Sequence, residues 1–174
     1  VKCGNGAFME KPEEASNLAK SLVSVANKSG CKTSAIVTDM NQPLSQSVGN
    51  SIEIQSVIKV LNGDKIDSRL LEITHILGES ILCNSGLFNN KAQARAQMEK
   101  ALSTGRASEK FAEMVSALGG PTDLMDKPKK YLRNAIIAKE VRATEAGFVN
   151  YMDTKALGNI LISLGGGRNK VEDK

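Results

Sequence analysis

Two polar turns carry the residue types that could bind a ligand in this chain. The first, Gly4-Asn5-Gly6, is followed by Phe8 and precedes a predicted helix start. The second, Asp39–Gln42, follows the short apolar run Ala35–Val37. In parallel α/β sheets the carboxyl ends of neighbouring strands share one edge, and ligands bind there. The pattern therefore predicts a binding edge, called the rim below, formed by these two turns.

The chemistry of the rim has alternatives that the residues alone leave open. Phe8 either packs beneath its turn as core or lines a pocket for a flat, apolar-faced ligand such as a base. Gly4 and Gly6 lack the third glycine of a dinucleotide fingerprint, because Met9 stands in its place. A tight turn with positive φ is therefore favoured over phosphate binding. The polar residues 39–42 either hold their loop or bind a ligand or ion.

Side chains that act in nucleophilic or metal-assisted catalysis are sparse. His75 is the only histidine, and it falls off the apolar stripe of a predicted helix over 67–84. We expect it to have a surface or interhelical role. The cysteines lack zinc-ligand spacing and any Cys-x-x-Cys pair, which favours free thiols in a reducing cytoplasm: Cys3, Cys31 and Cys83. We predict no catalytic residue in this chain.

Composition limits the class of protein. The chain has 174 residues, of which 41% are apolar and 24% charged, as in one ordinary globular domain with or without a small appendage. The net charge of +4 is modest, and the basic cluster at 127–133 is expected to be a solvated face. Few aromatic residues and no tryptophan argue against nucleic-acid binding. No apolar run has the length needed to cross a bilayer.

Hydrophobic periodicity indicates the elements that position the rim. A helix over 12–29 and a buried strand over 34–38 complete a β–α–β unit with a right-handed crossover. Four helices follow, at 50–61, 67–84, 91–104 and 107–118. In the second of these, Ile66, Leu70, Ile73, Leu77 and Ile81 form one apolar stripe. The expected fold is α/β, with a parallel-sheet unit beside a helical layer.

The pattern changes after Pro128. Strands are expected over 135–143 and 147–151, joined by a turn at 145–147, with a helix capped by Asp153 or Thr154 behind them. We therefore divide the chain into a partial α/β domain, 1–130, and the start of a small α+β unit, 131–174. Val1 is no initiator and Val171–Lys174 closes no element, so we expect the chain to be the interior of a longer protein.

Several collinear phrases resemble one enzyme family, the thymidine and pyrimidine-nucleoside phosphorylases. They are VKCGNGAFM at 1–9, TDMNQPL at 38–44, GPTD at 120–123, MDTKALG at 152–158 and GGGR at 165–168. The GAFM and DMNQPL phrases favour this family over the anthranilate phosphoribosyltransferases, which look related in fold. The resemblance implies reversible phosphorolysis of thymidine to thymine and 2-deoxyribose 1-phosphate. It also implies a cytoplasmic, homodimeric enzyme of nucleoside salvage whose substrates are phosphate and a pyrimidine nucleoside, with no nucleic acid and no membrane.

The resemblance also assigns roles to residues at the rim. It implies that Phe8 lines the pyrimidine pocket and that Gly4 and Gly6 shape the adjacent turn. No cofactor is required, but related enzymes hold a potassium ion. The matching ligands here are the carbonyls of Leu44 and Ser47, while the family's glutamate is replaced by Ser56. As a hypothesis, Glu53, three residues earlier on the same helix face, supplies the missing carboxylate.

Other parts of the family pattern have no counterpart in this sequence. The sequence lacks the phosphate-binding loop and the arginine, serine and lysine that bind the base. It also lacks the α domain and most of the C-terminal unit. We therefore expect the isolated chain to be inactive. Two other classes of protein stay open: a noncatalytic binding module derived from the same fold, and a nucleotide-binding oxidoreductase domain.

Overall fold

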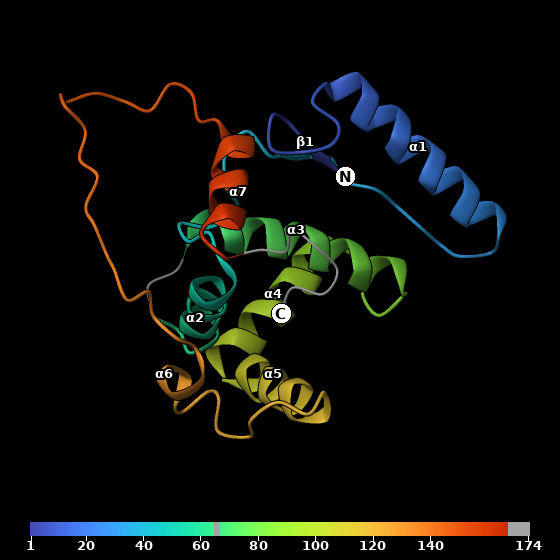
Figure 1. Ribbon diagram of the computed structural model, residues 1–174. Helices are drawn as coiled ribbons and strands as arrows, with labels where there is room; N and C mark the ends of the chain where they lie inside the picture. Colours follow the sequence, from blue (N-terminus) through green and yellow to red (C-terminus); the bar gives the residue numbers. More distant parts are fainter. Residues whose placement is uncertain (65–66, 167–174) are drawn as a thin grey trace.

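The computed structural model describes residues 1–64 and 67–166 as a helix-rich α/β arrangement that includes a short parallel sheet (Figure 1). Strands β1 (Lys2–Cys3) and β2 (Thr38–Asp39) pair in parallel, with Lys2 opposite Thr38 and Cys3 opposite Asp39. The predicted α/β fold class is confirmed.

Helix α1 (Pro12–Lys28) connects the two strands. Pro12 suits the first helical position, Glu13 and Glu14 face the positive end of the helix dipole, and Gly30 follows the last turn with φ of 82°. The helix predicted over 12–29 is therefore confirmed. Ala15 and Ala19 are its buried residues, and the helix lies at the periphery beside β1 (Figure 1).

The predicted helical layer is also confirmed. It comprises α2 (Asn50–Leu61), α3 (Ser68–Asn84), α4 (Lys91–Ser103) and α5 (Arg106–Ala117). A short helix that was not predicted, α6 (Pro128–Tyr131), follows them. The side chains of Asp67 and Asn90 cap α3 and α4 by accepting the N–H groups of Leu70 and Gln93. Ile58, Ala94 and Leu124 are the buried apolar residues here.

The buried face of α3 differs from the predicted apolar stripe. Leu77 and Ile81 are 45% and 67% exposed, whereas His75 and Glu79 are buried. The reason is that α4 packs against α3 and its Arg95 forms ion pairs with Glu79 and Glu72. Of the two roles expected for His75, surface or interhelical, its burial excludes the surface one. Within the stripe, Leu77 and Ile81 are exposed, whereas Leu70 and Ile73 are half-buried. Ile66 lies outside the described residues.

The strand predicted over 34–38 is wrong in length and in burial. Only Thr38 of that run belongs to β2, and Val37 is 44% exposed. Parallel strands are buried when neighbours pair with both edges and helices cover both faces. Among the described residues β2 pairs with β1 alone, on one edge.

The predicted hairpin is absent from the described residues between α6 and α7. Ile136 and Phe148 are each 103% exposed, and the segment arcs away from the helices (Figure 1). An isolated two-stranded hairpin is marginal in water, because its apolar face needs a covering layer. No element in the described part of the chain covers these side chains.

Helix α7 (Thr154–Ser163) follows this segment, and the predicted cap is confirmed because Asp153 accepts the N–H of Ala156. Gly165 follows with φ of 81°, whereas Gly167 and Arg168 lie outside the described residues. No helix in residues 1–64 or 67–166 is both long and apolar enough to span a bilayer.

Candidate functional site

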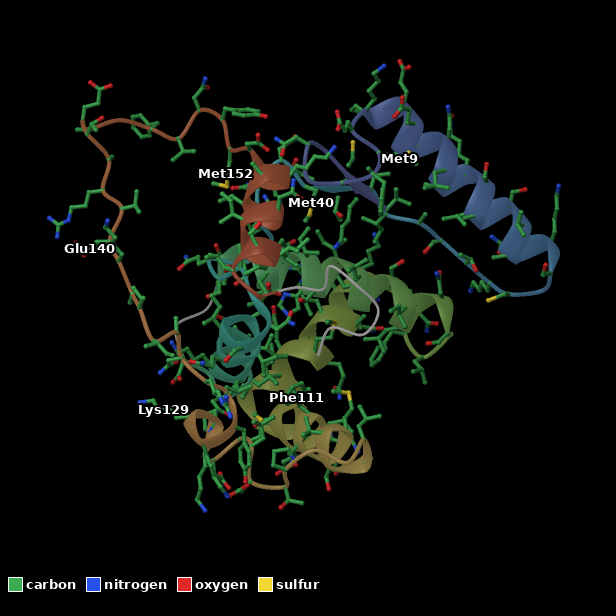
Figure 2. All side chains as sticks on the ribbon, in the orientation of Figure 1. Met9, Met40, Phe111, Lys129, Glu140 and Met152 are labelled. Atoms are coloured by element: carbon green, nitrogen blue, oxygen red, sulfur yellow. The ribbon has the colours of Figure 1, made fainter. Side chains whose placement is uncertain are left out.

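The two predicted turns lie side by side at the ends of β1 and β2. The Met40 N–H donates to the Cys3 carbonyl at 2.6 Å, and the Gly6 N–H donates to the Met40 carbonyl at 3.1 Å. Within the first turn, Gly4 N–H donates to Met9 at 3.0 Å. The rim expected from the parallel topology is therefore formed, and Met9, Met40 and Met152 mark the three segments that meet there (Figure 2).

Asn5 joins the first turn to α7. Its side-chain amide donates to the Met152 carbonyl at 2.9 Å, and its Oδ1 accepts the Thr154 N–H at 2.9 Å. The sequence analysis missed this role, although an asparagine between two glycines is a signal for a polar side chain that serves the turn. The start of α7 thus becomes a third component of the rim.

Close packing explains both glycines of the turn. Gly4 has φ of 131°, and a Cβ there would lie 2.7 Å from Oδ1 of Asn41. A Cβ on Gly6 would lie 2.6 Å from Cγ2 of Thr154 and 2.9 Å from the Met40 carbonyl oxygen. The positive φ predicted for this turn is found at Gly4, whereas Gly6 is required by its close contacts alone.

The backbone N–H groups of this turn are already used within the chain. Gly4 and Gly6 donate as described, Asn5 N–H donates to Asn41 Oδ1 at 3.1 Å, and Ala7 N–H donates to the Gly4 carbonyl at 2.9 Å. Phosphate-binding turns present free N–H groups to the anion. In this arrangement the turn offers a surface for a ligand but no anion cradle.

Asp39 organises the second turn. Its Oδ1 accepts the Asn41 N–H at 3.0 Å, and Arg69 from α3 donates to both its carbonyl and its carboxylate. The Asn41 N–H holds the pKa of Asp39 below its ordinary value, and Arg69 adds to the effect. The polar groups of Asp39 and Asn41 are therefore used to hold the conformation of this loop. No local signal in the sequence identified Arg69 as a partner.

A groove of about 580 Å³ runs beside Phe8 at the rim. Its lining is mostly apolar and includes Phe8, Met9, Leu18 and Met40, with Lys2, Glu10 and Lys155 as the charged side chains. This volume lies within the range of small-molecule sites, which is ~300–1,000 Å³. Phe8 is 103% exposed, so its ring is available on both faces to an apolar-faced ligand.

The four residues predicted to bind potassium are only partly brought together. The hydroxyls of Ser47 and Ser56 lie 2.9 Å apart, beside a pocket that also contains Lys59. Glu53 instead accepts the Gly49 N–H at 2.8 Å, and Leu44 does not line this pocket. The described arrangement offers two hydroxyls without the carboxylate of Glu53, so potassium binding stays a prediction.

Asp67 connects the same loop to the helical layer. Its carboxylate accepts N–H groups from Leu70 at 3.2 Å and Gln46 at 3.0 Å. Burial acts to raise the pKa of Asp67, but these hydrogen bonds outweigh it, and the pKa is lowered from its ordinary value of 3.8. The ionised form therefore stabilises the folded state.

This contribution has a defined pH dependence. Because the folded-state pKa lies below 3.8, the stabilisation is complete above that pH and is lost as pH falls through the folded-state value. We expect Asp67→Asn to lose stability less steeply than the wild type between about pH 4 and pH 2, measured as urea midpoints. Asp126→Asn is the control, since Asp126 has no described ion pair. Equal slopes for the Asp67→Asn variant and the wild type would contradict the assignment.

The parallel β–α–β unit, with a groove of about 580 Å³ beside the turns that follow its strands, defines an α/β protein. The chain is 44% identical over 173 residues to thymidine phosphorylases of Burkholderia cenocepacia strain HI2424, Burkholderia orbicola strain AU 1054 and Burkholderia lata strain 383. These matches cover 99% of the chain and 40% of each relative. Over almost its whole length the chain is therefore similar to thymidine phosphorylases.

The chain spans about 40% of the length of the curated relatives it matches. No family model matches it.

Proposed function

We propose that the protein containing this chain is a pyrimidine-nucleoside phosphorylase, most similar to thymidine phosphorylase, and that this chain supplies one wall of its base pocket. The observation that carries the proposal is the 44% identity over 173 residues. The apolar groove beside Phe8 supports it, because a pyrimidine ring has apolar faces that fit such a surface. We further propose that the whole enzyme is a cytoplasmic homodimer.

The reaction makes demands that the described residues meet only in part. Phosphate attacks the anomeric carbon, the glycosidic bond breaks through a cationic sugar, and the base leaves as an anion or protonated. This requires cations around the phosphate and donors to the base carbonyl. The turn N–H groups at the rim are internally bonded. The lysines lining the groove beside Phe8 in the described residues are Lys2 and Lys155, and Lys155 already pairs with Glu10 at 3.8 Å. We therefore propose that the chain alone positions the base but does not catalyse phosphorolysis.

The test combines a turnover assay with a binding assay. We expect no phosphate-dependent thymine release from thymidine by the purified chain at the intact mass of 174 residues. Thymidine should shift the NMR signals of Phe8 and Met40. Phe8→Ala should weaken this binding at least tenfold, and Phe148→Ala, at an equally exposed ring, should leave it unchanged. Thymine release by a chain of the stated mass would show that the isolated chain is active and contradict that part of the proposal. NMR shifts caused by a dinucleotide but not by thymidine would contradict the proposed phosphorylase function.

A noncatalytic binding module is the second candidate function. The fully used N–H groups of the first turn favour it, since they leave no place for the phosphate in this part of the rim. Such a module would bind a protein partner stably while showing no response to thymidine or phosphate.

A further inference from the structure

A small pocket of about 210 Å³ lies between the loop that follows β2 and the second half of α2. Ser47 lines it from the loop, Ser56 and Lys59 line it from α2, and Asp67 lines it from the cap of α3. By its resemblance to the phosphorylases, the chain is expected to hold a potassium ion at this loop, on carbonyl oxygens and on a carboxylate at position 56. Position 56 has a hydroxyl instead, which leaves a bound cation without that negative charge.

The hydroxyl protons of the pocket are used within the chain. The Ser56 hydroxyl donates to the Ile52 carbonyl at 3.0 Å. Because a hydroxyl has a single proton, the Ser47 hydroxyl must be the donor in its 2.9 Å contact with Ser56. The groups left open on these two serines are therefore acceptor lone pairs, which suit either a cation or an N–H donor.

The carboxylates of Glu53 and Asp67 both hold backbone N–H groups. Glu53 accepts the Gly49 N–H at 2.8 Å, at the beginning of α2. Asp67 accepts the Leu70 N–H on one oxygen and the Gln46 N–H on the other, at 3.2 and 3.0 Å. In this arrangement neither side chain replaces the carboxylate that position 56 lacks.

Lys59 brings a positive charge to the same pocket. It lies one turn after Ser56 on α2, so the two side chains share one face of the helix. Lys59 and the ionised Asp67 together make the charge of this lining zero before any ion binds. A potassium ion would meet the like charge of Lys59, whose three N–H donors suit the same oxygen acceptors. The donor set of this pocket therefore does not fit a potassium ion.

We propose that the ammonium of Lys59 takes the place of a potassium ion in this pocket, which binds no monovalent metal ion. Lys59 supplies the positive charge that the acceptors of Ser47 and Ser56 need, and so stabilises the loop against α2. That loop follows directly on the second turn of the rim, Asp39–Gln42, which makes Lys59 a positioning residue for this turn. The role of Lys59 is the same whether or not the whole protein performs phosphorolysis.

The test compares urea midpoints of the purified chain in potassium chloride and in choline chloride at equal ionic strength. An ion that binds only the folded state raises the midpoint as its concentration increases. We expect the wild type to have the same midpoint in both salts. The double variant Ser56→Glu, Lys59→Gln gains the carboxylate and loses the ammonium. It should bind potassium about tenfold more tightly than the wild type, as calculated from the midpoint shift.

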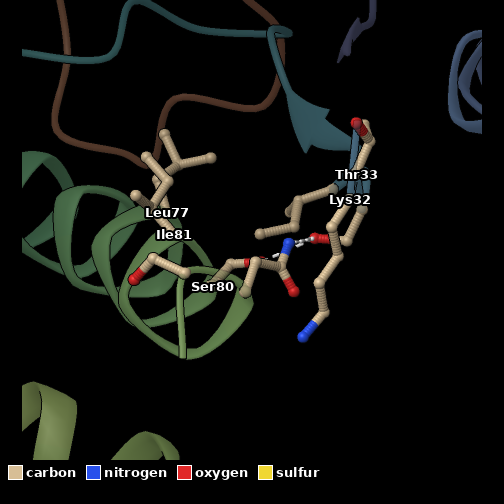
Figure 3. Close-up of a pocket in the computed structure, with 9 residues that line it drawn as sticks. Lys32, Thr33, Leu77, Ser80 and Ile81 are labelled. Carbon is tan, nitrogen blue, oxygen red and sulfur yellow. Dashed lines mark hydrogen bonds between the residues drawn. The ribbon is translucent and has the colours of Figure 1, made fainter. Parts of the chain in front are cut away.

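The matched control is a second lysine that lies beside a pair of serine hydroxyls. Lys32 and Ser80 line a groove between the segment after α1 and α3 (Figure 3), where the hydroxyls of Ser34 and Ser80 lie 2.8 Å apart. The double variant Ser80→Glu, Lys32→Gln makes the same change of charge outside the loop and should show no response to potassium. An equal response of the two double variants would identify a general effect of added negative charge and contradict the proposal.

Single variants test Lys59 itself. Lys59→Gln should have a lower midpoint than the wild type in choline chloride, because the acceptors lose their positive partner. Lys59→Arg keeps the charge and should recover most of the difference. A potassium-dependent rise in the wild-type midpoint, no potassium response of Ser56→Glu, Lys59→Gln, or equal midpoints for Lys59→Gln and Lys59→Arg would each overturn the proposal. None of these measurements involves catalysis, so thymine release tests the proposed function separately.

Discussion

Gly6→Val is expected to destabilise the fold by about 1–3 kcal/mol, the range for overpacking at a tight contact. The Cβ would meet Thr154 Cγ2 at 2.6 Å and the Met40 carbonyl oxygen at 2.9 Å, and backbone atoms cannot rotate away as a side-chain terminus can. The change therefore pushes α7 and the second turn away from the first. Urea denaturation gives the free energy, and faster exchange of the Thr154 amide would show that α7 has been displaced.

The control is Gly158→Ala, in the middle of α7. No atom lies within 4 Å of a Cβ built on Gly158. Alanine is the better helix former, so this variant should gain about 0.5–1 kcal/mol. If Gly6→Val were as stable as the wild type, the close approach of turn and helix would be wrong, and the rim would lose its third component.

Helices could be predicted from this sequence because their signals are local. Pro12 and Gly30 bound α1, and Asp67 and Asp153 cap α3 and α7, all within a few residues of the element concerned. Their side-chain periodicity is likewise contained in one stretch of chain. These elements were predicted to within one or two residues of the structure.

Strands and helix faces depend on neighbours that the local sequence does not identify. The runs at 34–37 and 135–151 have the composition of strands. In the described residues the first run has one backbone hydrogen bond, from the Val1 amino group to the Ile36 carbonyl, and the second pairs with no strand. The stripe of Leu77 and Ile81 suggested the wrong buried face of α3, because an ion pair from α4 decides which side packs. The number and spacing of apolar residues in one helix do not show which residue of another helix will pack against it.

The candidate site, like the fold, could be predicted only where its signals follow from local sequence and strand topology. The meeting of the two turns followed from parallel topology, and the hydrogen bond from the Gly6 N–H to the Met40 carbonyl agrees with it. The bond from Asn5 to Thr154 spans 149 residues and had no local signal strong enough to predict it. The roles given to Phe8, Leu44 and Ser56 stay predictions, since their tests require a bound ligand or ion.

The second large effect is expected from Arg95→Met. The Arg95 Nε donates to the buried carboxylate of Glu79 at 2.5 Å, while its terminal nitrogens bind Glu72 at 2.9 and 3.0 Å. Hydrogen bonds from Arg95 lower the pKa of Glu72, and Glu72 and Glu79 together raise the pKa of Arg95. Without Arg95, Glu79 is a buried charge with no partner, so we expect the melting temperature to fall by roughly 5–10 °C.

Two further variants distinguish the loss of the ion pair from a general effect of removing a long side chain. Lys110→Met breaks the exposed pair with Glu113 on α5 and should leave the melting temperature nearly unchanged, because solvated pairs contribute little. The double variant Arg95→Met, Glu79→Leu removes the stranded carboxylate and should melt well above Arg95→Met alone. If the double variant instead melted at or below the single one, the packing of the Arg95 stem, and not its charge, would hold α3 against α4.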